Sequence, residues 1–385
     1  MTRVTRPPAR VWVWTAATLV VAVVAVLLWR TSSVAATSSS TATGAASTPS
    51  AAPAAQLGTA WAADTTSAAS GPVAVGGRVL TTDRHGLALR DAVTGEEAWH
   101  YRRSDAQVCG ATAVGALVVA VFRTTGECNE AVALRVATGV RQWTRNVSYL
   151  AGARISSSAQ VLLASTPTGV TTLDPVGDNT RWRQSPTAGC GYAATAVGSA
   201  GVVLVQRCPD APTVQVQLRD GISGAVTWTV DLPTGGAPVR LLGADQLVTV
   251  LVGDTVHVFS PQSGTELPAL ALAPPPPGRT AADEPLQQTA TGDVVLLWAR
   301  GTAYALDAGS GGVRWQQPAL GLPAVQPDAG SVGVLEDGGY VRRSLADGAE
   351  LGRSPVDADV PAGGRAAQVG PAVVYATADR VLALR

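Results

Sequence analysis

A tryptophan recurs at nearly regular intervals along most of this 385-residue chain, and a similar short turn precedes it each time. The stretch LRDAVTGEEAW, residues 89–99, is the clearest copy, with a glycine four residues and an aspartate eight residues before the tryptophan. Such repetition restricts the fold strongly, because it requires one structural unit to be repeated along the chain. The tryptophans are Trp99, Trp143, Trp182, Trp228 and Trp315, and the matching glycines are Gly95, Gly139, Gly224 and Gly311.

Two weaker copies complete the series. Gly264 stands four residues before Pro268, and Gly348 stands four residues before Gly352. The markers at 99, 143, 182, 228, 268, 315 and 352 are therefore 44, 39, 46, 40, 47 and 37 residues apart. The intervening sequence consists of short apolar runs between glycine-rich turns, which is typical of strands. A period near 40 with strand-like content predicts an all-β propeller of four-stranded antiparallel blades.

The motif has a physical explanation within one blade. The glycine can adopt positive φ in the turn between the third and fourth strands. The aspartate, as at Asp91 or Asp220, can accept hydrogen bonds from the backbone amides of that turn. The tryptophan is large and flat, so it can lie between adjacent blades while its N–H binds a carbonyl. We therefore expect the motif to fasten one blade to the next.

The two ends of the repeat region predict a closed ring. The chain stops at LALR, residues 382–385, without the turn and tryptophan strand that should follow. The missing strand is present in LGTAWAAD at residues 57–64, where Trp61 lies 38 residues before Trp99. Pairing of these ends would complete the last blade and remove an open sheet edge. We expect eight blades, or seven if the degenerate stretch between Pro268 and Thr302 folds differently.

The N-terminal region predicts a membrane helix and a linker. Residues 11–29 contain no charged side chain, and as a helix they would span about 28 Å, enough for a bilayer core. Residues 1–10 carry three arginines, which predicts a cytoplasmic N-terminus and an extracytoplasmic body. The alternative is a cleaved secretory signal with its cut site at residues 33–36. Residues 30–56, rich in Ser, Thr, Ala and Pro, are expected to be a disordered linker before the propeller at 57–385.

The four cysteines allow three pairings, and the repeat register favours one of them. In each case the first cysteine should precede strand one, and its partner should lie near the end of strand two or in the loop after it, so we predict Cys109–Cys128 and Cys190–Cys208. Each bond would be worth roughly 3 kcal/mol in the chain-entropy model and requires an oxidising compartment. A zinc site is the weaker alternative, because no C-x-x-C pair is present.

The stretches LDAGSGGVRW and LRDAVTGEEAW resemble the tryptophan-docking repeats of the pyrroloquinoline-quinone (PQQ)-like β-propellers over residues 57–385. The resemblance implies an eight-bladed fold of that type. The family contains quinoprotein dehydrogenases as well as non-enzymatic scaffold proteins. The dehydrogenases carry an adjacent cysteine pair and hold Ca²⁺ with Glu, Asn and Asp. This chain has no adjacent cysteines, and none of its asparagines, Asn129, Asn146 and Asn179, has a matching context.

We therefore predict a binding or scaffolding module without a cofactor, metal or catalytic residue, anchored in the membrane and presenting loops to a protein or cell-envelope ligand. The alternative is a PQQ-dependent redox enzyme. The three histidines, His85, His100 and His257, share no motif. With 28 basic and 28 acidic residues, the chain has no net charge, which argues against nucleic acid as a partner.

Overall fold

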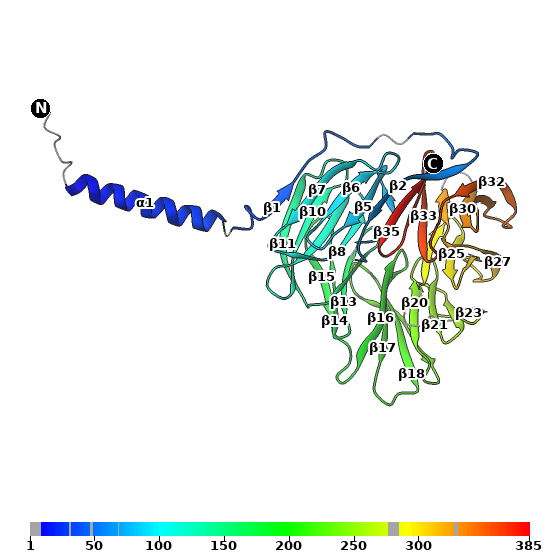
Figure 1. Cartoon of the computed structure of the whole chain (residues 1–385). Coiled ribbons are helices and arrows are strands. Elements are labelled where there is room, and N and C mark those ends of the chain that lie inside the picture. The colour runs from blue at the N-terminus through cyan, green and yellow to red at the C-terminus, as the bar shows by residue number, and fades with distance from the viewer. Residues whose placement is uncertain (1–8, 31, 47–48, 68, 276–284, 327–329) are drawn as a thin grey trace, which may run out of the picture.

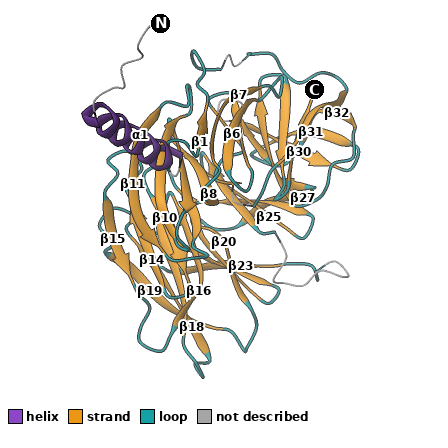
Figure 2. Cartoon of the chain, turned by 60° about the vertical axis from the view of Figure 1, so that its left-hand side comes forward, coloured by secondary structure: helices purple, strands orange, loops and turns teal. Residues whose placement is uncertain are grey.

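The computed structural model describes residues 9–30, 32–46, 49–67, 69–275, 285–326 and 330–385. Most of the predicted cytoplasmic N-terminus, residues 1–8, and part of the degenerate stretch after Pro268 lie outside these ranges. Within these ranges the chain has one helix, α1 (Ala9–Arg30), and its other regular elements are strands (Figures 1 and 2). The all-β prediction and the apolar N-terminal helix are both confirmed.

The strands form antiparallel sets of four in chain order, which we call blades. Blade 1 contains β4 (Ala74–Val75), β5 (Arg78–Thr82), β6 (Gly86–Asp91) and β7 (Glu97–Arg103). Blade 2 contains β8 (Gln107–Val114), β9 (Leu117–Arg123), β10 (Cys128–Arg135) and β11 (Arg141–Tyr149). Blade 3 contains β12 (Arg154–Ser157), β13 (Leu162–Thr166), β14 (Gly169–Leu173) and β15 (Thr180–Gln184). Blade 4 contains β16 (Gly191–Gly198), β17 (Gly201–Arg207), β18 (Thr213–Arg219) and β19 (Val226–Pro233).

Two further sheets follow in the same pattern. One contains β20 (Val239–Gly243), β21 (Val248–Val252), β22 (Thr255–Phe259) and β23 (Glu266–Ala271). The next contains β24 (Gln287–Thr291), β25 (Val294–Ala299), β26 (Thr302–Asp307) and β27 (Val313–Pro318). Three short strands add to the sheets, β1 (Thr37–Ser39) on β7, β3 (Ala69–Ser70) on β8, and β28 (Gly321–Leu322) on β33 (Gly364–Val369).

The last sheet in the described part of the chain has nine strands and combines two antiparallel sets. The first set is β29 (Ala324–Gln326), β30 (Ser331–Glu336), β31 (Gly339–Ser344) and β32 (Glu350–Asp357), and the second is β33, β34 (Ala372–Ala376), β35 (Arg380–Leu384) and β2 (Leu57–Asp64). A short parallel pairing of β2 with β32 joins them. The prediction of eight blades depends on counting these two sets separately.

Pairing of β2 with β35 confirms the predicted closure of the chain ends. The two strands are antiparallel, with Trp61 opposite Ala383 and Ala62 opposite Leu382. Leu57, the first residue of β2, is fully buried. The pairing therefore brings both ends of the propeller into one sheet.

Six tryptophans each fasten one set of strands to the next. The indole N–H of Trp99 in blade 1 donates to the carbonyl of Val136 in blade 2 at 2.9 Å, and Trp61 in β2 donates to Ala92 in blade 1 at 3.1 Å. The same bond recurs around the ring, from Trp143 to Pro175, Trp182 to Gly221, Trp228 to Pro261, and Trp315 to Leu345. Because each acceptor lies in the turn between the third and fourth strands of the next blade, these bonds link successive blades.

The repeated glycines have a second role beyond the turn. Each has φ between 70° and 76°, as the turn requires. Each also lies against the side chain at the marker position of the preceding blade, so that a Cβ on Gly139 would stand 2.7 Å from Cδ2 of Trp99. The same holds for Gly95 on Trp61, Gly224 on Trp182, Gly264 on Trp228, and Gly348 on Trp315.

The predicted marker at Pro268 is wrong. The residue in the tryptophan position of β23 is Leu267, not Pro268, because Leu267 lies opposite Val258 and contacts Gly311 of the next sheet. Its strand lacks the bulge that the other fourth strands have beside their turn, so the side chain that faces the next blade is shifted by one residue.

The aspartates cap these turns. The Asp220 carboxylate accepts hydrogen bonds from the backbone N–H groups of Ile222 and Ser223, and from the Ser223 hydroxyl. The Ser223 amide and hydroxyl are the main causes that hold the pKa of Asp220 below its usual value. The amides of Gly177 and Val176 lower the pKa of Asp174 in the same way.

These lowered pKa values predict acid sensitivity. A carboxylate whose pKa is lower when folded stabilises the protein above its unfolded pKa, about 3.9, and this stabilisation disappears as the pH falls through the folded pKa. We expect the melting temperature to fall between about pH 5 and about pH 3. Asp220→Asn keeps an acceptor oxygen but does not titrate, so its melting temperature should fall less steeply. If the melting temperature fell equally steeply with pH in the unmodified protein and in Asp220→Asn, this role of Asp220 would be contradicted.

Residues 32–46, part of the segment that the sequence predicts to be a disordered linker, are instead held on the propeller. We call this segment the strap. Its strand β1 pairs with β7, with Thr37 opposite Arg103, and Ala42 donates to the carbonyl of Thr138. Further along, Gly44 accepts a hydrogen bond from buried Arg78. Small and polar residues can therefore lie on the propeller edge by backbone pairing, although they bury little apolar surface.

Candidate functional site

The two faces of the propeller carry different loops. The Asp–Gly turns, between third and fourth strands, lie on one face, which we call the turn face. The connections between second and third strands lie on the other. Both disulfides lie there, so we call it the disulfide face.

Blade 3 is shorter than both of its neighbours. Its strands have 4, 5, 5 and 5 residues, against 8, 7, 8 and 9 in blade 2 and 8, 7, 7 and 8 in blade 4. At about 3.3 Å per residue, a difference of about three residues is worth about 10 Å. Blade 3 therefore leaves a recess between taller walls.

The recess opens on the disulfide face. The fourth strand of blade 2 ends at Tyr149, six residues after Trp143, whereas that of blade 3 ends at Gln184, two residues after Trp182. The tryptophans lie near the turn face, so the missing length is at the opposite end. A cavity of about 270 Å³ occupies this place, and we call it the notch.

The notch is lined mainly by groups that form hydrogen bonds. Hydroxyls and an amide face it from blades 2 and 3, together with the guanidinium of Arg183 and no carboxylate. A smaller cavity of about 80 Å³ continues it toward blade 4 and shares Gln184 and Ser185. The polar lining of the notch is Ser148, Thr166, Thr168, Thr171, Arg183, Gln184 and Ser185.

Two side chains give the notch its electrostatic character. Arg183 is exposed, and its side chain makes no hydrogen bond or ion pair with any described residue. Tyr149 is buried, its hydroxyl has no hydrogen-bond partner among the described residues, and burial raises its pKa to about 12. A cationic group without a partner beside neutral donors and acceptors favours a ligand with carboxylate or carbonyl oxygens.

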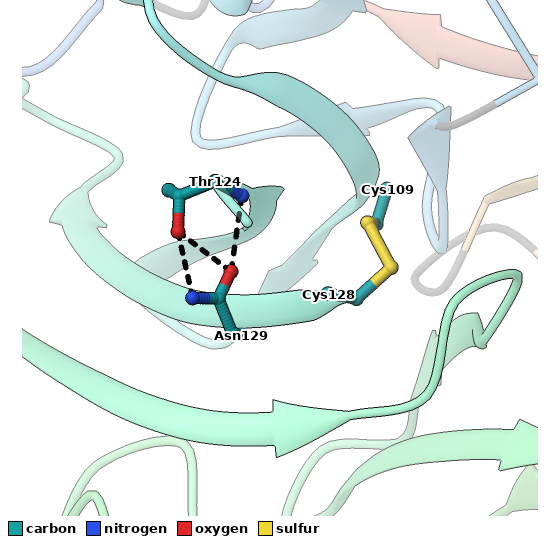
Figure 3. Close-up of a disulfide and its surroundings, with 4 residues drawn as sticks. All are labelled: Cys109, Thr124, Cys128 and Asn129. Atoms are coloured by element: carbon teal, nitrogen blue, oxygen red, sulfur yellow. Dashed lines mark hydrogen bonds between the residues drawn. A yellow bond between two sulfur atoms is a disulfide. The ribbon is translucent and has the colours of Figure 1, made fainter. Parts of the chain in front are cut away.

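Both walls are held by disulfides. Cys109 bonds to Cys128 in blade 2, and Cys190 bonds to Cys208 in blade 4, the pairing that the sequence predicts. The strand positions differ from the prediction in blade 2, because Cys109 lies within β8 and Cys128 begins β10. Beside the first bond, the side chain of Asn129 holds the turn through Thr124 (Figure 3). The loops beside the notch are thus stiffened.

The residues considered for a quinone or metal site have other contacts. Asn129 and Asn146 cap turns, and Asn179 donates to the carbonyl of Gly177. The histidines are equally dispersed. The His85 ring hydrogen-bonds to the carbonyl of Ala106, the His100 ring to the strap, and the His257 ring to Glu266. Within the described ranges, no three His, Cys, Asp or Glu side chains gather to hold a metal. These residues do not fit the PQQ and Ca²⁺ site of the dehydrogenases.

A family model described as outer membrane protein assembly factor BamB matches residues 26–188 and 166–326. The chain belongs to this family. Its PQQ-like propeller type, expected from the repeats, is therefore shown. No curated protein matches the chain.

Solved structures agree on the fold. BamB from Moraxella catarrhalis is 14% identical, with a TM-score of 0.53, covering 86% of this chain and 99% of that one. The computationally designed Ika8 protein is 13% identical, with a TM-score of 0.53, covering 85% and 98%. Quinohemoprotein alcohol dehydrogenase from Comamonas testosteroni, 13% identical and covering 86% and 76%, has a TM-score of 0.49, too low to bear on function.

Proposed function

We propose that this chain is a membrane-anchored, extracytoplasmic scaffold that binds a protein of the cell envelope through the notch. The single observation that carries the proposal is the notch itself, a recess with an unpaired arginine between the disulfide-bonded blade 2 and the short blade 3, which a smaller cavity continues toward the disulfide-bonded blade 4. Membership of the BamB family supports a scaffolding role.

The N-terminal helix α1 supports membrane anchoring. Residues 10–30 form an apolar helix long enough to cross a bilayer, and none of it is buried against the described chain. Exposed side chains such as Leu19, Val21 and Leu28 would be unfavourable in water. Lipid would cover them, and disulfides on the body are consistent with an oxidising compartment outside the cytoplasm.

The binding role can be tested with two charge reversals. Arg183→Glu should reduce recovery of the bound envelope protein from solubilised membranes at least about tenfold, because it places a negative charge where the ligand's oxygens bind. Arg141→Glu is the matched control, since Arg141 is also exposed on a fourth strand but lies near the turn face. Quantitative mass spectrometry of the captured proteins gives the comparison.

Equal recovery with both variants, at unchanged melting temperature, would contradict the notch as the binding site. The enzymatic alternative has its own test. If Ca²⁺ and PQQ raised the melting temperature of the purified chain and supported dye-linked alcohol oxidation, the scaffold proposal would be wrong.

A further inference from the structure

We propose that the notch faces the membrane and that its occupant is the extracytoplasmic segment of another membrane protein. This inference rests on the proposed anchor and binding function. It follows from how the strap joins α1 to the propeller, which fixes the face that lies nearest the bilayer.

The connection between helix and propeller is short. Helix α1 ends at Arg30, and β1 begins at Thr37. Six residues can span at most about 20 Å, and hydrogen bonds from Ser32 to Trp29 and from Ala36 to Ser32 shorten this connection further. The end of β1 nearest the helix is therefore held close to the bilayer surface.

That end lies on the disulfide face. Thr37 is opposite Arg103, the last residue of β7, and Ser104 donates to the carbonyl of Ala36. Arg103 leads into the connection to blade 2, which is on the disulfide face. From there the strap runs toward the turn face, where Ala42 contacts Thr138 beside the blade 2 turn.

Side-chain contacts hold the strap in this register. Ser38 and Ser40 both bond to the His100 ring, at 3.2 Å and 3.0 Å. In both overall views, α1 lies on the side of the propeller that carries β1 and β11 (Figures 1 and 2). The notch opens beside the end of β11, so it is on the membrane-proximal face and in a blade close to the anchor.

The position selects the kind of partner. A segment that emerges from the bilayer beside the anchor already lies near the notch, so anchoring both proteins in one membrane raises its effective concentration there. Its carboxylate or carbonyl oxygens would meet Arg183 and the surrounding hydroxyls. A large soluble protein would instead have to enter between the propeller and the lipid.

Fluorescence transfer in nanodiscs tests the orientation without any ligand. All four native cysteines are disulfide-bonded, so an introduced cysteine can be labelled selectively. Thr168→Cys and Val176→Cys place a donor at exposed positions on opposite faces of the same blade. With acceptors on lipid headgroups, we expect at least about twofold higher transfer efficiency from residue 168. Equal or reversed efficiencies would overturn the orientation.

A variant of the strap tests whether its pairing with β7 sets the orientation of the propeller. Ser38→Pro should weaken pairing of β1 with β7 and reduce the difference between the two labelled positions. An unchanged difference would show that the strap does not set the orientation.

Photo-crosslinking in native membranes tests the occupant. A photoreactive residue at 168 should yield adducts with a protein that resists alkaline carbonate extraction, and one at 176 should not. Adducts only with extractable proteins would overturn the membrane partner. If residue 168 gave no adduct while the transfer result held, the proposed binding function would fail but the orientation would stand.

Discussion

Replacing Trp99 by alanine should lower the free energy of unfolding by about 3–5 kcal/mol, the range for truncating a buried aromatic side chain. Trp99 is fully buried between blades 1 and 2. Its removal leaves a cavity beside Gly139, which has no side chain to fill it, and leaves the carbonyl of Val136 without its donor. Chemical denaturation followed by circular dichroism measures the change.

Trp143→Ala is the matched control. Trp143 makes the same bond, to Pro175, but is only partly buried. The turn that follows in blade 3 has Asp178, with φ of 56°, in the glycine position. Because less apolar surface is lost, we expect a smaller destabilisation than for Trp99→Ala. Equal losses, or a loss below about 1 kcal/mol for Trp99→Ala, would contradict the fastening role.

The repeat motif predicts the blades well because its residues act locally. Asp91, Gly95 and Trp99 belong to one turn and one strand, so their spacing is visible in the sequence. What the spacing does not show is that Gly95 contacts Trp61, the tryptophan of the preceding blade. That contact depends on how blades stack, which no single copy of the motif contains.

The notch is not among the features predicted from the sequence, although the repeat spacing carries a signal for it. The markers at 143 and 182 are 39 residues apart, between spacings of 44 and 46, which indicates a short blade 3. The markers at 228, 268 and 315 give a similar pattern, so spacing alone does not select blade 3. The predicted disulfides on both neighbouring blades add a second signal, because they mark the taller walls.

Composition gives the wrong expectation for the strap because it describes burial and not backbone pairing. The Ser, Thr and Ala residues of the strap offer little apolar surface, which favours disorder. An exposed edge at β7 can nevertheless pair with any extended segment through backbone groups. The sequence contains no pattern that identifies such pairing.

Removing residues 382–385 should have the largest effect, because it opens the ring. Leu382, Ala383 and Leu384 are buried, and they form most of the pairing with β2. Loss of two buried leucines alone costs about 4–10 kcal/mol, and the strand β2 is left unpaired on that side. We expect most of the truncated protein to aggregate or to unfold at a much lower urea concentration.

Leu384→Ala distinguishes the effect of opening the ring from the effect of losing a buried leucine side chain. This variant keeps the backbone pairing with Thr59 while losing one buried side chain, so it should cost about 2–5 kcal/mol and remain soluble. Limited proteolysis gives an independent measurement, because an open ring exposes β2 to cleavage. If the truncated chain stayed soluble, with a urea midpoint no lower than that of Leu384→Ala, the chain ends would contribute burial but not closure.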